Sequence, residues 1–193
     1  MSGPRSPALR KGGSMTEKTP DWDQGRVQVY TGDGKGKTTA AFGLALRAAG
    51  RGLKVVVAQF AKGRDTGEVL AAERFSDLIT VRRFGRKGFL RGRPADEDRD
   101  EARRGMQVVR DVLAEGGYSL VILDEINIAT HYGLVPVEDL LDALEGRAKS
   151  VEVVLTGRNA DLRVLAAADL VTHMRAVKHY FAQGTPARKG IEE

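Results

Sequence analysis

A glycine-rich stretch, TGDGKGKTT at residues 31–39, decides the fold of this chain. The apolar run VQVY precedes it at 27–30, and an Ala- and Leu-rich segment follows it over 37–49. A strand, a glycine loop and a helix in this order can bind phosphate, because glycines let backbone N–H groups point into a concavity. The N-terminal end of the helix adds a positive dipole. The stretch therefore predicts a phosphate-binding loop.

This loop is a shortened form of the G-x-x-x-x-G-K-[ST] pattern, in which the lysine supplies a cation and the hydroxyl can bind Mg²⁺. The first glycine of the pattern would stand at position 31, which is a threonine here. A glycine-rich turn with two solvated lysines is the alternative. The residues that we expect to contact the phosphates of a nucleotide are Gly32, Asp33, Gly34, Lys35, Gly36, Lys37, Thr38 and Thr39.

Strands and helices alternate along the rest of the chain. Short apolar runs predict strands over 27–30, 55–58, 79–84, 120–123, 151–155 and 170–172. Helices are predicted over 37–49, 66–75, 136–144 and 161–168. A longer helix is predicted to begin at Pro94-Ala95-Asp96 and to end at Gly116-Gly117. This alternation is typical of an α/β protein with a mostly parallel sheet and helices on both faces.

The composition indicates one ordered domain, which we place at residues 25–193 of the 193. Residues 1–24 mix Gly, Pro, Ser and charge, and they predict a flexible leader in which Trp22 is exposed. The chain has no cysteine, which excludes disulfides, a thiol nucleophile and an iron–sulfur centre and fits a cytoplasmic location. No apolar run reaches the roughly 18 residues of a transmembrane helix.

The positive charge is concentrated locally. The formal net charge is +5, and residues 82–93 contain six basic side chains and no acid. Such a cluster suits an anionic partner, which could be a nucleotide, a nucleic acid or a carboxylate-rich ligand. A solvated loop is the plain alternative.

Two further strand ends carry candidate residues. The apolar run 120–123 ends in Asp124 and Glu125, and carboxylates at the carboxyl edge of a parallel sheet can bind Mg²⁺. Arg158 follows the strand predicted over 151–155, on the same edge, and could bind phosphate through two N–H groups. The three histidines have no metal-binding spacing.

The motifs together resemble one family, the P-loop ATP:corrinoid adenosyltransferases. The resemblance rests on GDGKGKTTAA, VILDEINIA, LTGR and VKHYFAQGTPARKGIE, and it runs from about Gly25 to Glu193. It implies a RecA-like P-loop fold, usually as a homodimer. It also implies an enzyme that moves the 5′-deoxyadenosyl group of ATP to the Co(I) of a corrinoid and releases triphosphate, in adenosylcobalamin synthesis or salvage.

The resemblance also implies roles for single residues. Lys37, Thr38 and Glu125 match catalytic positions, with Thr38 and Glu125 as Mg²⁺ ligands and Asp124 close by. Lys62, Gly63 and Glu68 match positions near the nucleoside of ATP. Phe89 matches an apolar position that excludes the lower axial ligand of cobalt, whereas Arg91 stands where the family often has Trp. We expect Arg91 to contact the corrinoid, and a reduced flavoprotein to supply the electron.

Two other functions are possible for a chain of this kind. An ATPase or kinase of the same fold would need a group that positions water or an acceptor hydroxyl, and no such residue stands out. A RecA-like module that binds nucleic acid through residues 82–93 would show salt-sensitive binding. The motif set favours the adenosyltransferase, acting without nucleic acid and without a membrane.

Overall fold

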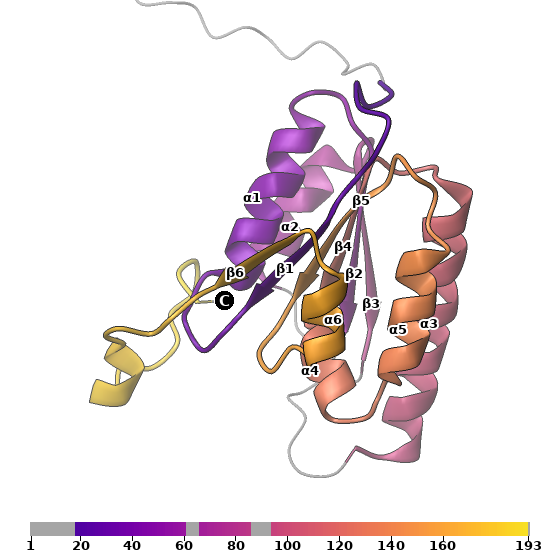
Figure 1. Cartoon of the computed structure of the whole chain (residues 1–193). Coiled ribbons are helices and arrows are strands. Elements are labelled where there is room, and N and C mark those ends of the chain that lie inside the picture. The colour runs from indigo at the N-terminus through magenta and orange to yellow at the C-terminus, as the bar shows by residue number, and fades with distance from the viewer. Residues whose placement is uncertain (1–17, 61–65, 86–93, 193) are drawn as a thin grey trace, which may run out of the picture.

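The centre of the molecule is a parallel sheet in the order β3-β2-β4-β5-β1-β6 (Figure 1). The computed structural model describes residues 18–60, 66–85 and 94–192. Every strand pairing within these residues is parallel. The strands are β1 (Val27–Thr31), β2 (Val55–Phe60), β3 (Ile79–Phe84), β4 (Leu120–Asp124), β5 (Glu152–Thr156) and β6 (Leu170–His173).

Helices cover both faces of the sheet, as the sequence predicted (Figure 1). One face carries α1 (Lys37–Ala49), α2 (Gly67–Ala72) and the 3₁₀ helix η1 (Glu73–Phe75). The other face carries α3 (Asp96–Glu115), α4 (Ile126–His131), α5 (Val137–Glu145) and α6 (Leu162–Ala167). None of these described helices is long and apolar enough to cross a bilayer.

The alternation of side chains along each strand explains the two cores. Along β2, Val55 and Val57 pack with α1, whereas Val56, Ala58 and Phe60 pack with α3. Successive side chains of a strand point to opposite faces, so a strand covered on both faces must be apolar throughout. The continuous apolar runs in the sequence are therefore a direct result of this layering.

The structure differs from the sequence-based prediction at two short helices, α4 and η2 (Tyr180–Gln183), which were not predicted. Each is too short to show a helical repeat of apolar residues. The start of α4 is set instead by Glu125, whose φ of 61° turns the chain directly after β4.

The prediction that Trp22 is exposed was wrong. Its side chain is half-buried against the α1 face, and its indole N–H donates a hydrogen bond of 2.9 Å to the carbonyl of Ser150. The backbone N–H of Lys18 also bonds to Gly52, at 2.9 Å. A tryptophan N–H usually finds a partner when the ring is covered, which ties this segment to the domain.

Candidate functional site

The loop between β1 and α1 lies at the carboxyl edge of the sheet and needs its glycines. Gly32 and Gly36 have φ angles of 96° and 115°, which side chains rarely tolerate. A Cβ atom on Gly32 would also lie 2.4 Å from the carbonyl oxygen of Met174. The glycines of the sequence pattern therefore allow both the turn and the close approach of a second segment.

Lys37, the first residue of α1, is folded across this loop. Its ammonium donates hydrogen bonds of 2.7 and 2.8 Å to the carbonyls of Gly32 and Gly34, and the residue is only 8% exposed. The structure thus places a buried cation inside the loop, next to the N-terminal end of a helix. Both features favour an anion.

Asp124 is the buried centre of the site. One carboxylate oxygen accepts hydrogen bonds from the hydroxyls of Thr38 (2.8 Å) and Thr156 (2.7 Å). The other accepts from the amide of Gln59 at 3.0 Å. These three donors come from α1, β5 and β2, so the carboxylate joins the glycine loop to the middle of the sheet. They also fix the direction in which the Thr38 hydroxyl points.

Glu125 lies beside Asp124 but has a different environment. It is half-buried and in the left-handed region, and its backbone N–H donates to Thr156 Oγ1 at 3.0 Å. A non-glycine residue with this backbone conformation is uncommon and is frequent at functional sites. Thr38 is bonded to Asp124 at the end of β4, and Glu125 is the next residue along the chain. The binding of a metal by Thr38, Asp124 and Glu125 stays a prediction.

Arg158 forms an ion pair with Asp33 of the glycine loop. The guanidinium Nε of Arg158 is 4.0 Å from the Asp33 carboxylate, and both side chains are largely exposed. Arg158 follows β5 as predicted, and the ion pair places it within reach of the loop. Glu68 is half-buried in the first turn of α2.

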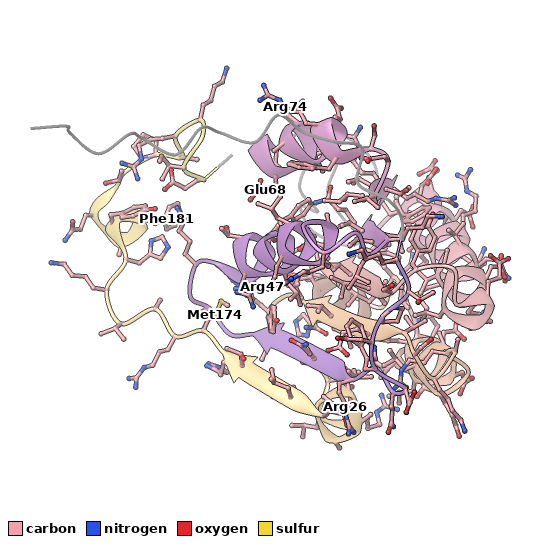
Figure 2. All side chains as sticks on the ribbon, turned by 90° about the horizontal axis from the view of Figure 1, so that it is seen from above. Arg26, Arg47, Glu68, Arg74, Met174 and Phe181 are labelled. Carbon is pink, nitrogen blue, oxygen red and sulfur yellow. The ribbon has the colours of Figure 1, made fainter. Side chains whose placement is uncertain are left out.

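The segment after β6 packs against the glycine loop, which sequence reasoning did not predict. The N–H of Gly34 donates to the Met174 carbonyl at 2.7 Å, and the N–H of Met174 donates to Thr31 at 2.8 Å. Figure 2 shows this segment leaving β6 near Met174 and carrying Phe181 along the side of the molecule. The sequence offered no local signal for these contacts beyond the family motif itself.

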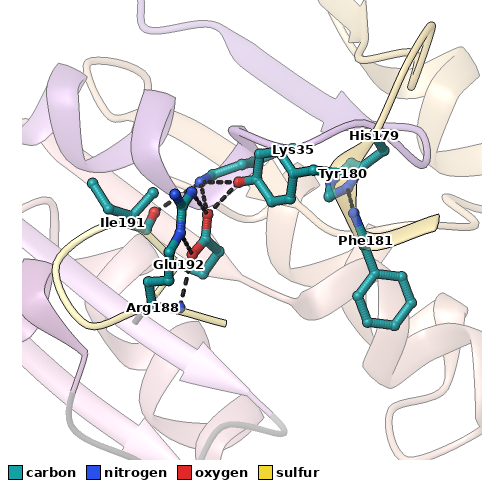
Figure 3. A network of polar contacts seen from close by, with 7 residues as sticks. All are labelled: Lys35, His179, Tyr180, Phe181, Arg188, Ile191 and Glu192. Carbon is teal, nitrogen blue, oxygen red and sulfur yellow. Dashed lines mark hydrogen bonds and ion pairs between the residues drawn. The ribbon is translucent and has the colours of Figure 1, made fainter. Parts of the chain in front are cut away.

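The same segment binds the side chain of Lys35. The Lys35 ammonium donates to the Tyr180 hydroxyl (3.0 Å), the Ile191 carbonyl (2.8 Å) and the Glu192 carboxylate (2.9 Å), as Figure 3 shows. The pKa of Lys35 is raised, mainly by the hydrogen bond to Tyr180 and next by the hydrogen bond to Glu192. His179 has a local role, because its Nδ1 accepts a hydrogen bond from the N–H of Phe181.

Several predicted residues fall outside the described part of the chain. They are Lys62 and Gly63, near the nucleoside, and Phe89 and Arg91, at the corrinoid. Of the six basic residues in 82–93, the structure describes Arg82 and Arg83, which are exposed on β3. The predicted roles of these residues stay predictions.

The glycine loop, the buried lysine and the threonine–aspartate pair define a P-loop nucleotide-binding protein. The family model of the ATP:corrinoid adenosyltransferases BtuR/CobO/CobP matches residues 23–192. This protein belongs to that family, and the resemblance inferred from its motifs is confirmed.

Named relatives agree with the family model. A corrinoid adenosyltransferase of Pseudomonas aeruginosa is 39% identical over 173 residues, which is 88% of this chain and 84% of the relative. One from Escherichia coli K12 is 37% identical over 88% of this chain and 86% of the relative. Corrinoid adenosyltransferase CobA of Salmonella typhimurium is also 37% identical, with the same coverage. These comparisons support an enzyme that adenosylates corrinoids over the kinase and nucleic-acid alternatives.

Proposed function

We propose that this protein transfers the 5′-deoxyadenosyl group of ATP to the Co(I) centre of a corrinoid and releases inorganic triphosphate. The observation that carries the proposal is the shortened glycine loop with Lys37 folded across it, in a chain of the adenosyltransferase family. In the reaction a cobalt–carbon bond forms at the ribose 5′-carbon, and the carbon–oxygen bond to the triphosphate breaks. The product serves adenosylcobalamin synthesis or salvage.

For this reaction the protein must position the two substrates and stabilise the charge of the leaving group, and it needs no general base. Co(I) is a strong nucleophile, so no proton has to be removed before it attacks. Negative charge grows on the departing triphosphate, and fixed donors stabilise such charge most effectively. Lys37 and the loop N–H groups are those donors, and Lys37 would exchange the carbonyls of Gly32 and Gly34 for phosphate oxygens.

Magnesium fits the residues at the loop. The described residues hold no group of three or more His, Asp or Glu side chains that could bind a metal by themselves. Mg²⁺ is often bound by one or two protein ligands plus substrate phosphates. We assign Thr38 and Glu125 as its ligands, with Asp124 orienting the Thr38 hydroxyl through their 2.8 Å hydrogen bond. Bound Mg²⁺ would neutralise charge on the triphosphate.

The corrinoid side of the reaction rests on the family resemblance. In the proposal Phe89 excludes the lower axial ligand, Arg91 contacts the corrinoid, and a reduced flavoprotein supplies the electron that makes Co(I). Lys62, Glu68 and Arg158 contact ATP. We also propose a homodimer and a cytoplasmic location.

One assay tests the central proposal. Chemically reduced cob(I)alamin, ATP and Mg²⁺ are mixed with the protein without oxygen. The expected result is a light-sensitive cobalt–carbon product and free triphosphate in equal amounts. Release of ADP and phosphate without that product would show instead an ATPase or kinase.

A further inference from the structure

The contacts of Lys35 use the full donor capacity of its side chain. An ammonium group has three N–H donors. Tyr180, Ile191 and Glu192 accept one hydrogen bond each, at 3.0, 2.8 and 2.9 Å. In this conformation Lys35 must therefore give up at least one of these contacts before its side chain can donate to a phosphate.

The carboxylate of Glu192 is held as a bound oxyanion would be. Besides Lys35, it accepts from Arg188 through Nη2 (3.1 Å), Nε (3.3 Å) and the backbone N–H (2.8 Å). The Tyr180 hydroxyl donates to it as well, and Figure 3 shows these groups converging on the carboxylate. Two cations, a hydroxyl and a backbone N–H are also the donors that bind phosphate in proteins.

The aromatic ring of Tyr180 keeps the two cations together. The Lys35 ammonium lies 5.7 Å from the ring centroid and the Arg188 guanidinium 5.1 Å, which is within the range of cation–π attraction. Contacts with Arg188, Tyr180 and Lys35 lower the pKa of Glu192, so its carboxylate stays charged at neutral pH. The cluster is thus a preformed cationic pair neutralised in part by an acid of the same chain.

We propose that Lys35, Tyr180 and Arg188 form an oxyanion subsite at the edge of the phosphate loop, and that Glu192 occupies it until a polyphosphate displaces it. The phosphate loop lies beside this subsite, because Lys35 belongs to both. The neighbouring loop residue Gly34 also bonds to Met174, at the start of the segment that carries Tyr180 and Arg188. A polyphosphate carries more charge and more acceptor oxygens than one carboxylate, which favours the exchange. The identity of this ligand as the triphosphate of ATP rests on the proposed function.

The test measures binding of inorganic triphosphate by calorimetry, without corrinoid. Glu192→Gln keeps the shape of the side chain and removes the competing charge. The expected result is about two- to fivefold tighter binding than in the wild type, the size of an exposed ion pair. Glu101→Gln, whose partner is Arg104 on the surface of α3, is the matched control and should change nothing.

A second variant tests the role of Arg188. Adding Arg188→Gln to Glu192→Gln removes one cation of the subsite, so the gain in affinity should disappear. Unchanged or weaker triphosphate binding by Glu192→Gln alone would overturn the proposal. Glu192 would then only hold the segment after β6 against the loop. The same conclusion would follow if the double variant kept the full gain.

Hydrogen exchange gives an independent readout in the wild type. The N–H groups of Ile191 and Glu192 donate to the Arg188 carbonyl while Glu192 is in place. Saturating triphosphate should speed their exchange, and unchanged exchange would contradict displacement. Failure of the proposed function would appear separately, as absence of the cobalt–carbon product in the wild-type assay.

Discussion

At the scale of single residues, the site combines a buried cation, Lys37, with a buried anion, Asp124, which accepts a hydrogen bond from Thr38. Lys37 is held by two loop carbonyls, and Asp124 by three side-chain donors. A buried charge is tolerated only when its hydrogen bonds are satisfied. We therefore assign the two residues different roles. In the proposed function Lys37 exchanges its two carbonyl partners for phosphate oxygens, whereas Asp124 keeps its three hydrogen bonds and holds the surrounding structure in place.

Lys37→Ala should abolish most of the turnover and keep the fold. Removing one fixed donor from a developing charge costs about 10²–10³ in rate. The measurement is the initial rate of cobalt–carbon bond formation, with thermal unfolding as the control for folding. A rate within about threefold of the wild type would contradict the assignment.

Glu125→Gln should raise the Mg²⁺ concentration for half-maximal activity more than Asp124→Asn does. The reason is that Asp124 already accepts from Thr38, Thr156 and Gln59, so it acts by orienting Thr38. Mg²⁺ titrations of both variants at saturating ATP measure the difference. A larger shift for Asp124→Asn would reverse the two roles.

Thr156→Val should destabilise the protein by about 1–3 kcal/mol, because it removes a donor from a buried carboxylate. Thr156 Oγ1 donates to Asp124 and accepts from the N–H of Glu125. Urea unfolding gives the free energy of unfolding. Thr172→Val on the exposed strand β6 is the control and should be nearly neutral; equal losses in both variants would point to a general effect on the sheet.

At the scale of elements, α3 approaches the sheet closely at one glycine. A Cβ atom on Gly105 would lie 2.7 Å from Cγ of Phe84 and 2.9 Å from Cε1 of Phe60. Those two rings, on β3 and β2, lie 5.7 Å apart between centroids. The helix can therefore reach the sheet at this distance only because the side chain is absent.

Gly105→Ala should destabilise the protein by about 1–3 kcal/mol through overpacking, although alanine favours a helix. Gly43→Ala, in the middle of α1, is the opposite case, because nothing lies within 4 Å of the added Cβ. It should stabilise by about 0.4–1 kcal/mol. Chemical unfolding of the pair separates the effect of packing from that of helix propensity. A stabilised Gly105→Ala would show that the rings move aside.

The same elements show how far the sequence could predict this molecule. The six strands and the long helices follow from apolar periodicity and glycine stops, and the phosphate loop follows from its motif. The Lys35 network could not be predicted, because its partners lie more than 140 residues away along the chain. The roles of Gln59 and Thr156 were missed for a similar reason, since only strand register brings them to Asp124.

At the scale of the whole molecule, the site is where distant parts of the chain are joined. The loop after β1 leads into α1, whose Thr38 bonds to the end of β4, and Gly34 of the loop bonds to the segment after β6. Asp124 adds β2 and β5. A ligand that binds this loop contacts the folded state alone, so its binding energy adds to the free energy of unfolding of the domain.

Mg²⁺ and ATP should therefore raise the melting temperature of the wild type. At a ligand concentration of about 100 times Kd the gain is about 2.7 kcal/mol, and for a chain of this size each kcal/mol shifts the melting temperature by about 2–4 °C. Inorganic triphosphate should reproduce most of the shift and adenosine little of it, since the loop is built for the phosphate end of ATP. Lys37→Ala should remove the triphosphate effect, measured by differential scanning fluorimetry. A shift from adenosine as large as that from triphosphate would mean that the glycine loop is not the main anchor of the nucleotide.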